Sequence, residues 1–370
     1  MSNTPDLPWI PARRTAPARA ADWVRGFSVG QVAVATPFLL APMSGVTDTA
    51  FRVTVLEASG AASVGLLTTE FLSVELLTSG HMATRMRMAF APELERPLSV
   101  QLFGGDPGRM AEAARHVEAA GAQVVDINCG CPAPKVVRRG GGAELMRDPS
   151  HLARLVEAAA TAVDIPVTVK LRSGWDDSQR NVVEVAQLAE RAGAAMISVH
   201  GRSRAQRYAG APDWDLVDEV ARAVRVPVVG SGDLVAAEQA LARLRHTQAA
   251  GVMIGRAAIM NPWIFGQIQD LIAGRAPRVP GSAARVALVE AFAERLSHTL
   301  PEGAIAGRLK QLLARLSKGV PGGGLLRSVA LRATTHEALL AHVRAFFEAA
   351  ELGETARWAE TTRLQLERVG

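Results

Sequence analysis

Short apolar runs and longer helical stretches alternate along most of this chain of 370 residues. Eight of the apolar runs have the length and composition of buried strands. They are Pro37–Pro42, Ser63–Thr68, Leu98–Phe103, Val124–Ile127, Val167–Leu171, Ala195–Val199, Val226–Val229 and Gly251–Ile254. Between most of them, apolar residues recur at three- and four-residue spacing, as in Met110–Ala120, Leu152–Val163, Val182–Ala192 and Leu216–Val224. Eight such strand–helix units predict an α/β protein whose parallel strands close into a (β/α)8, or TIM, barrel.

The alternation stops near residue 276, where prolines and a glycine predict a linker. Helical patterns follow it, over Ala283–Leu300, Ala304–Lys318, Thr335–Glu351 and Glu354–Arg368. We therefore expect a barrel domain over residues 31–275 and a smaller all-helical domain over residues 282–370. Residues 1–30 are rich in Pro, Ala and Arg, and this composition predicts a flexible leader.

The positive charge is concentrated at the C-terminal end of the chain. Residues 275–370 contain 14 Lys and Arg against 9 Asp and Glu, and the other residues contain 27 of each kind. A basic module beside a neutral one is typical of a protein with a polyanionic partner. A solvated helical surface rich in arginine is the simpler explanation, and five charges alone do not exclude it.

Cysteine usage and hydropathy restrict the class of protein. The only cysteines are Cys129 and Cys131, too few for a disulfide framework or for a four-ligand zinc site, so we expect no metal. No apolar run approaches the length of a membrane span, and the N-terminus has no apolar signal-peptide core. These features predict a cytoplasmic protein in a reducing compartment.

Polar and ionisable side chains follow nearly every predicted strand, where a barrel of this kind builds its active site. Burying Gln101, Lys170 or His200 without partners would cost several kcal/mol each. Taken singly, each could be a core residue with a satisfied partner. Taken together at one end of a barrel, they favour a polar ligand site. The set comprises Pro42, Met43, Glu70, Gln101, Asn128, Cys131, Lys170, Arg172, His200, Arg202, Arg204, Asp233 and Arg256.

Two further features of these loops carry candidate chemistry. Glycines at the ends of the seventh and eighth strands, Gly232 and Gly255, stand beside the cation Arg256, which favours a phosphate-bearing cofactor over ordinary tight turns. The fourth strand leads into Asn128-Cys-Gly-Cys-Pro132. Cys131, taken alone, would most often be a small buried apolar residue. Its place at the end of a barrel strand favours a thiol that is presented to a ligand.

Five segments together resemble the tRNA-dihydrouridine synthase family, nearest to its bacterial B-type branch. They are Ala41–Arg52, Asp126–Pro132, Val169–Trp175, Ser198–Tyr208 and Met253–Arg256. The resemblance implies an FMN-binding TIM barrel followed by a helical RNA-binding domain. It implies reduction of the 5,6 double bond of uridine in tRNA, with hydride from reduced FMN, which NADPH regenerates, and a proton from Cys131. A cysteine with a pKa of about 8.5 is mostly protonated at neutral pH and can serve as that acid.

The resemblance also implies roles for individual residues. The expected flavin contacts are Pro42, Met43, Gln101, Lys170, His200, Ser231, Gly232, Asp233, Gly255 and Arg256. The expected substrate contacts are Asn128, Arg172, Arg202, Arg204, Lys318 and Arg327. We expect a monomer, because the helical domain would bind RNA alone. No role is assigned to Glu70 beyond pairing with a cation.

Two departures from the family pattern keep other functions open. The seventh strand ends in Ser231-Gly-Asp233, where the family usually has Asn-Gly-Asp. The helical stretch Leu309–Gly319 lacks the usual His and paired aromatic residues. The same chemistry on ribosomal RNA, a flavin oxidoreductase for a small pyrimidine or enone, and a non-catalytic RNA-binding relative are the alternatives.

Overall fold

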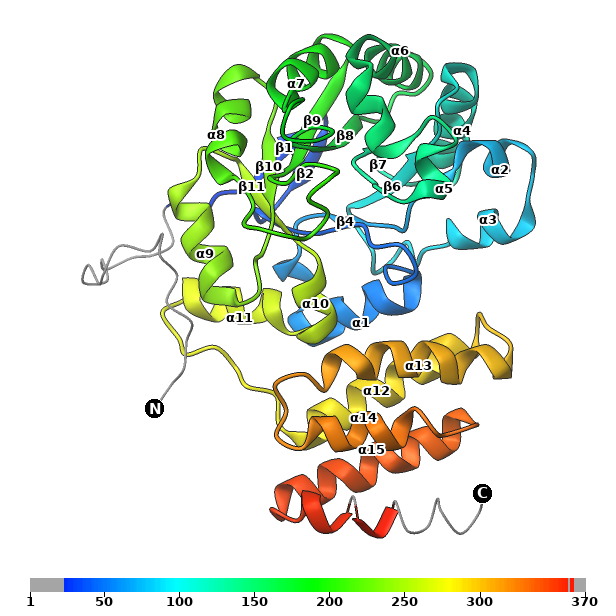
Figure 1. Cartoon of the computed structure of the whole chain (residues 1–370), viewed down its shortest axis with the longest axis vertical. Coiled ribbons are helices and arrows are strands. Elements are labelled where there is room, and N and C mark those ends of the chain that lie inside the picture. Colours follow the sequence, from blue (N-terminus) through cyan, green and yellow to red (C-terminus); the bar gives the residue numbers. More distant parts are fainter. Residues whose placement is uncertain (1–22, 359, 363–370) are drawn as a thin grey trace.

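The computed structural model describes residues 23–358 and 360–362, and its main feature is a closed parallel barrel (Figure 1). Neighbouring strands follow the order β3-β11-β10-β9-β8-β7-β6-β4. The barrel closes between β3 and the residue before β4, where the Leu40 N–H donates to the Leu66 carbonyl at 3.0 Å. The strands are β3 Phe38–Leu40, β4 Leu67–Thr68, β6 Leu98–Phe103, β7 Val124–Cys129, β8 Val167–Arg172, β9 Ala194–His200, β10 Val228–Ser231 and β11 Gly251–Ile254, and the two-residue β5 Leu72–Ser73 also pairs with β6. The predicted barrel is confirmed.

Helices cover the outside of the barrel, and aspartates begin several of them. Asp48, Asp106, Asp148 and Asp213 each accept a hydrogen bond from the backbone N–H three residues later, which caps the helix that follows. The helices are α1 Thr49–Ser59, α2 Val74–Thr78, α3 Met82–Arg87, α4 Pro107–Ala119, α5 Pro134–Val137, α6 Pro149–Ala160, α7 Val182–Arg191, α8 Trp214–Ala223, α9 Ala237–His246, α10 Arg256–Met260 and α11 Ile264–Ile272. Short 3-10 turns lie at Ala61–Ser63 (η1) and Gly142–Arg147 (η2).

An antiparallel hairpin, β1 Phe27–Val29 and β2 Val32–Val34, closes the N-terminal end of the barrel. Val29 and Val34 are buried in a cluster with the inward-facing residues of the barrel strands. The predicted leader to residue 30 is therefore too long at its C-terminal end, because these apolar side chains complete the barrel core. The rest of that predicted leader, residues 1–22, lies outside the described residues.

Four helices form the C-terminal region below the barrel in Figure 1: α12 Ser282–Ser297, α13 Glu302–Leu316, α14 Gly323–Ala330 and α15 His336–Glu351. Helix α14 was not predicted, because the run Gly322–Gly324 at its start is atypical of a helix. Leu326 and Val329 nevertheless bury its inner face. Beyond α15, residues 355–358 and 360–362 are helical, and the remainder of the predicted last helix lies outside the described residues.

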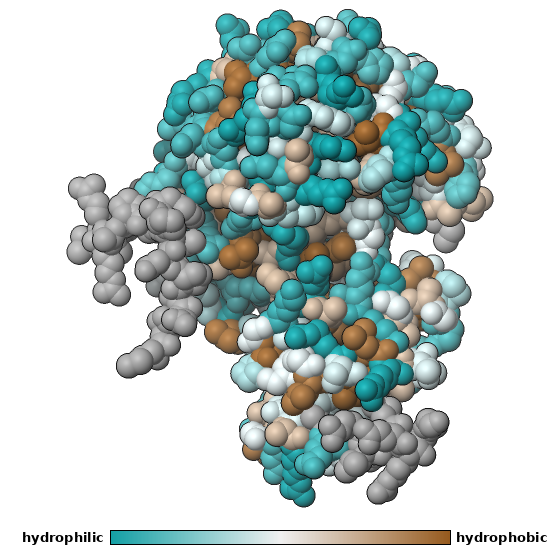
Figure 2. Space-filling view, viewed as in Figure 1, coloured by the Kyte–Doolittle hydropathy of each residue, from teal (hydrophilic) through white to brown (hydrophobic). Residues whose placement is uncertain are grey.

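The helical region packs against α1 and α10 of the barrel domain, and one continuous apolar core runs through both. Figure 2 shows hydrophobic residues at the junction and a notch in the outline where the two parts meet. Two salt bridges cross this interface, Arg295 with Glu57 and Arg308 with Asp48. Among the described residues, no helix has the length and apolar composition needed to cross a membrane.

Candidate active site at the C-terminal end of the barrel

Buried side chains from β6, β7 and β8 form one hydrogen-bonded network at the C-terminal end of the barrel, here called the mouth. The Asn128 amide donates to Gln101 Oε1 at 2.8 Å, and Gln101 Nε2 donates to Asp126 Oδ2 at 2.6 Å. Thr168 Oγ1 donates to the other Asp126 oxygen at 2.6 Å. Burial raises the pKa of Asp126, and the hydrogen bonds from Gln101 and Thr168 oppose that rise. The network fixes the side chains of Gln101 and Asn128 in one orientation.

Asn128 also shapes the segment that presents the candidate acid, residues 130–148, here called the Cys131 loop. Its Oδ1 accepts from the backbone N–H of Gly130 at 3.2 Å and of Cys131 at 2.9 Å. Cys131 is half-buried, whereas Cys129 is fully buried in the apolar core. Burial raises the pKa of the Cys131 thiol, although Arg172, Lys135 and Lys170 lower it in part. The thiol is therefore protonated at neutral pH, as a proton donor requires.

Arg172, an expected substrate contact, is used as a brace inside the protein. Its Nε donates to the Gly130 carbonyl at 2.7 Å, and its Nη1 donates to the carbonyls of Ser203 and Arg207 at 2.9 and 3.0 Å. The side chain is 5% exposed. Arg172 thus ties the Cys131 loop to the loop after β9 and holds the thiol in place.

Lys170 is a half-buried cation in this site that lies near the Asp126 carboxylate without pairing directly with it. It alternates along β8 with Val169 and Leu171, which pack outward in the core, and lies on the same face as Thr168. Among the described residues its ammonium group makes no hydrogen bond or salt bridge. Burial, and then the nearby Arg172, lower the pKa of Lys170 to about 8, although Asp126 and Cys131 oppose this shift. A half-buried cation of this kind fits a ligand that brings negative charge or hydrogen-bond acceptors.

His200, at the end of β9, is neutral at all ordinary pH values. Burial first, and then the cations Lys170, Arg172, Arg202 and Arg256, lower the pKa of His200 to about 2. A neutral imidazole offers one donor and one acceptor, so it can hydrogen-bond a ligand without adding charge. The positive potential around it is suited to an anionic group.

Asp233 and two arginines form the corner of the mouth after β10. Arg202 binds both Asp233 oxygens and the Gly210 carbonyl, and Arg256 donates to Asp233 Oδ1 at 3.0 Å. Arg202 is 2% exposed, whereas the Arg256 side chain is 51% exposed and lies over the ring of Tyr208. The expected RNA contact through Arg202 is therefore corrected: the structure buries this arginine as a partner of Asp233.

Of the two glycines predicted to approach a phosphate, Gly232 after β10 and Gly255 after β11, only Gly232 is required by its backbone conformation and close contacts. Gly232 adopts φ 144°, and a Cβ there would approach Pro212 to 2.6 Å. Gly255 has an ordinary φ, and a Cβ there would meet Ala41 and Met43 at 3.4 and 3.6 Å. The structure thus brings Met43 beside Gly255, with Pro42 next to it in the chain. Ser231, at the end of β10, pairs in register with His200.

Arg204 lies on the rim of the mouth in a cation–aromatic group that the sequence did not reveal. Its guanidinium lies 4.3 Å from the centre of the Trp175 ring, and that of Arg147 lies 4.9 Å from it. No local spacing signals this group, because its members come from three loops. Glu70 also has a partner that was missed: its carboxylate accepts a hydrogen bond from the backbone N–H of Gly45.

The two expected substrate contacts of the helical region lie apart from the mouth. Lys318 is exposed just after α13, and Arg327 is half-buried with its Nη1 donating to Ser317 Oγ at 3.1 Å. Arg308, which touches the barrel, is ten residues before Lys318, or about 15 Å along a helix. The structure therefore does not bring Lys318 and Arg327 into the same cluster as Lys170 and His200.

A polar cleft of about 610 Å³ is lined by the Cys131 loop and by the loop after β6, and not by Lys170 or His200. Gly105 and Gly140 lie within it, where the backbone of the loop after β6 crosses the Cys131 loop closely. Its charged side chains are of both signs, which gives no preference for one ligand charge. They are Glu75, Asp106, Arg139, Glu144, Arg147, Asp148 and His151.

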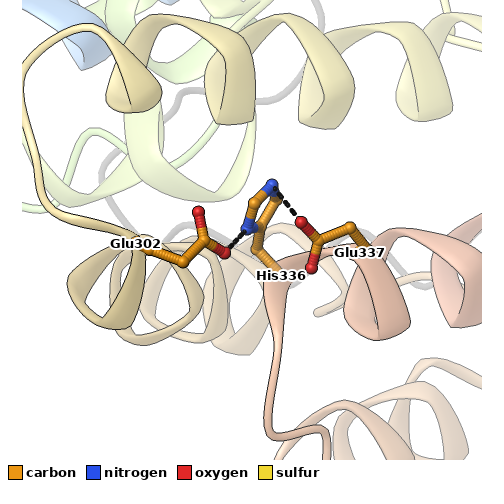
Figure 3. A group of neighbouring side chains, drawn as sticks. All are labelled: Glu302, His336 and Glu337. Atoms are coloured by element: carbon orange, nitrogen blue, oxygen red, sulfur yellow. Dashed lines mark hydrogen bonds and ion pairs between the residues drawn. The ribbon is translucent and has the colours of Figure 1, made fainter.

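Within the described part of the chain, one group of possible metal ligands, Glu302, His336 and Glu337, lies at the start of α13 and α15 (Figure 3). Glu302 contacts Nδ1 of His336, whereas Glu337 contacts Nε2 at 3.3 Å. The two carboxylates thus face opposite nitrogens of one ring. The expectation of no metal stays a prediction.

The closed parallel barrel, with its protonated thiol and cationic, polar mouth, defines a (β/α)8 enzyme joined to a helical module. A family model described as dihydrouridine synthase matches residues 39–351, and the chain belongs to this family. Dihydrouridine is uridine with a reduced ring, so the class is that of an oxidoreductase. The resemblance seen in the sequence is confirmed.

Individual relatives agree with this assignment. The chain is 44% identical over 248 residues to a probable tRNA-dihydrouridine synthase of Rhodobacter capsulatus, covering 67% of this chain and 75% of that one. It is 39% identical to tRNA-dihydrouridine synthase B of Xanthomonas campestris pv. campestris, covering 87% and 96%. A 2-naphthoyl-CoA reductase shares the fold alone, with a TM-score of 0.53 at 12% identity over 69% of this chain and 53% of that one.

Proposed function

We propose that this protein reduces the 5,6 double bond of uridine in tRNA to dihydrouridine, with FMN as bound cofactor, NADPH as reductant and Cys131 as proton donor. The observation that carries the proposal is the Cys131 thiol, which is half-buried and protonated and which Asn128 holds at the end of β7. The family and the names of the curated relatives support the substrate and the reaction.

The residues of the mouth fit a flavin. The half-buried ammonium of Lys170 makes no direct hydrogen bond or salt bridge among the described residues, and His200 supplies a neutral donor and acceptor beside it. Arg256 provides an exposed cation for a phosphate. When bound and reduced, FMN supplies the hydride for C6 of the uracil ring. The residues that would hold it are Pro42, Met43, Gln101, Lys170, His200, Ser231, Gly232, Asp233, Gly255 and Arg256.

Cys131 performs the acid half of the reaction by donating the proton on Sγ to C5 of the uracil. Asn128 fixes the backbone of the Cys131 loop, and Arg172 ties that loop to the next one. The thiolate left after transfer is stabilised by the positive charges of Arg172, Lys135 and Lys170, and it recovers a proton from solvent. The uridine must leave its stack to reach this site, so base flipping precedes reduction.

RNA would be held by one exposed and two half-buried cations outside the flavin site. Lys318 and Arg327 in the helical region and Arg204 on the rim are the proposed contacts, in a protein that acts as a cytoplasmic monomer. Ribosomal RNA is the second candidate substrate, because the surface of α13 lacks the aromatic residues usual in the family. A small pyrimidine or enone is the third.

The first test incubates the purified protein with NADPH and tRNA from cells that lack dihydrouridine, followed by nuclease digestion and mass spectrometry. We expect a gain of two hydrogens at a defined uridine. No gain from a yellow protein that oxidises NADPH would reject tRNA as the substrate and lead to the same assay on ribosomal RNA.

The second test replaces the proposed acid. Cys131→Ala should keep the bound flavin and its reduction by NADPH but lose RNA reduction by roughly 100-fold or more. Cys129→Ala is the matched control and should keep activity, because Cys129 is buried in the core away from ligand. Unchanged RNA reduction in Cys131→Ala would remove Cys131 from the mechanism.

A further inference from the structure

One residue in the loop after β3, Gly45, is held from two sides, once by each domain. The Gly45 N–H donates to a carboxylate oxygen of Glu70, which stands after β4 and is 9% exposed. The Gly45 carbonyl accepts from Nη1 of Arg308 in α13. Gly45 has φ +72°, a left-handed conformation that glycine adopts without strain. The loop therefore takes its shape from partners in both the barrel and the helical region.

Arg308 holds this loop at a second point. Its Nη2 contacts Asp48 Oδ2, while the other Asp48 oxygen accepts from the Phe51 N–H at 2.9 Å and caps α1. Gln311 accepts from Arg308 Nη1 at 2.5 Å and fixes the guanidinium in place. The Arg308 side chain is only 20% exposed. A planar guanidinium that donates to a carbonyl, a carboxylate and an amide oxygen at once is held in one orientation, which a single surface ion pair does not achieve.

Residues 43–48, here called the mouth loop, connect the Arg308 contacts at Gly45 and Asp48 to the proposed flavin site. Met43 N donates to Thr47 Oγ1 at 3.0 Å, and Thr47 N donates to the Met43 carbonyl at 3.0 Å, so the two ends of the loop move together. Met43 in turn lies beside Gly255. A shift of Gly45 or Asp48 is therefore transmitted to Met43.

We propose that Arg308 is a positioning residue through which the helical region sets the shape of the flavin site. The mouth loop is complete only when α13 is docked, so the module proposed to bind RNA also holds one wall of the cofactor pocket. This inference rests on the proposed function for its cofactor. It assigns to α13 a second role, distinct from contacting RNA.

The interface supplies its own matched control in Arg295. This residue of α12 pairs with Glu57 and donates to Thr54 Oγ1 at 2.9 Å, and its side chain is 21% exposed. It thus resembles Arg308 in burial and in bridging to α1. Its partners Glu57 and Thr54 lie within α1 and not in the mouth loop, so its loss should weaken docking without releasing Gly45.

The experiment compares Arg308→Met with Arg295→Met in the full chain. Amide hydrogen exchange of the peptide that covers residues 43–48 is measured in flavin-free protein, and the FMN dissociation constant is measured by flavin fluorescence. Losing charge-assisted hydrogen bonds should raise both the exchange rate and the dissociation constant by about tenfold in Arg308→Met. Both should stay within about twofold of wild type in Arg295→Met, at a similar loss of thermal stability.

Two further variants keep the test decisive. Arg308→Lys should recover part of the effect, because an ammonium group reaches either the carbonyl or the carboxylate but lacks the planar fork. Asp48→Asn keeps the helix cap and removes only the charge, so it should raise the exchange rate and the FMN dissociation constant by less than Arg308→Met does. It replaces Arg308→Met in the test if that variant does not fold.

Each result has a distinct meaning. Equal exchange and equal FMN affinity in Arg308→Met and Arg295→Met would overturn the inference even if wild type binds FMN and reduces RNA. Wild-type protein that binds no FMN would instead overturn the proposed function. The exchange measurement needs no flavin, so it still decides whether Arg308 holds the mouth loop.

Discussion

At the scale of single residues, burial sets the charge on the groups that the proposed chemistry uses. It keeps the proton on Cys131 and removes any charge from His200. It also makes the charged form of Lys170 unfavourable in the absence of a ligand. The sequence predicted these residue types at the strand ends, but it could not predict their protonation, because that depends on neighbours from other strands.

Charged Lys170 should therefore lower the stability of the flavin-free protein and favour binding of the cofactor. Its pKa of about 8 in the folded protein lies below the ordinary lysine value of 10.5, so the unfolded chain binds more protons between these values and stability rises with pH there. At neutral pH the charged lysine destabilises the flavin-free fold. We expect Lys170→Met to raise the free energy of unfolding of flavin-free protein by about 1–3 kcal/mol at pH 7.

The same Lys170→Met variant should bind FMN more weakly than wild type. Chemical denaturation at pH 7 and pH 9.5, with FMN titration alongside, measures both effects. Lys135→Met is the control, because that lysine is exposed on the rim and should change stability little. A Lys170 variant that is less stable than wild type at pH 7 would contradict the inference that the charged lysine destabilises the flavin-free fold.

At the scale of elements, the order of strands and helices was predictable because each carries its own apolar period. The closing hairpin β1–β2 and helix α14 were not predicted. The hairpin is short and follows a proline-rich stretch, and α14 begins in a run of glycines. Both are stable because they cover apolar surface of the rest of the molecule, which a local pattern does not record.

The Cys131 loop depends on one glycine for its position. Gly142 has φ +61°, and a Cβ there would meet the Cys131 carbonyl at 2.6 Å. Gly142→Ala should displace the thiol and lower RNA reduction by roughly tenfold or more, while flavin binding stays. Gly140→Ala is the control, because its φ of +69° brings the same backbone strain, but its Cβ would meet only an ordinary contact at 3.6 Å.

We measure RNA reduction and FMN affinity for both glycine variants. The comparison separates the effect of backbone strain, which both share, from displacement of the Cys131 thiol, which only Gly142→Ala should cause. Equal activity in Gly142→Ala and Gly140→Ala would show that contact with Cys131 does not position the acid.

At the scale of the whole molecule, basic side chains that could contact RNA lie on both the barrel and the helical region. The exposed Lys318 belongs to the helical region, and the stack of Arg147 and Arg204 on Trp175 belongs to the barrel rim. An RNA that reaches Cys131 while resting on Lys318 would span both. Phosphate contacts made in this way release counterions and make affinity depend on salt.

Binding of tRNA should therefore weaken as salt rises. Lys318→Ala should reduce the slope of log K against log salt by about 1, because one phosphate contact is lost. Arg344→Ala is the control, since Arg344 is already paired with Glu290. Filter binding over a range of salt concentrations measures both slopes. A slope unchanged by Lys318→Ala would place the RNA elsewhere.

The sequence by itself determined the barrel, the helical region after it, and which residues stand at the ends of the strands, because these follow from local periodicity and chain order. Only the tertiary structure decided what those residues do. It buried Arg202 against Asp233, made Arg172 a brace, left Lys170 without a partner and joined Glu70 to Arg308 through Gly45. Such pairings join residues far apart in the chain, and only packing brings them within hydrogen-bond distance.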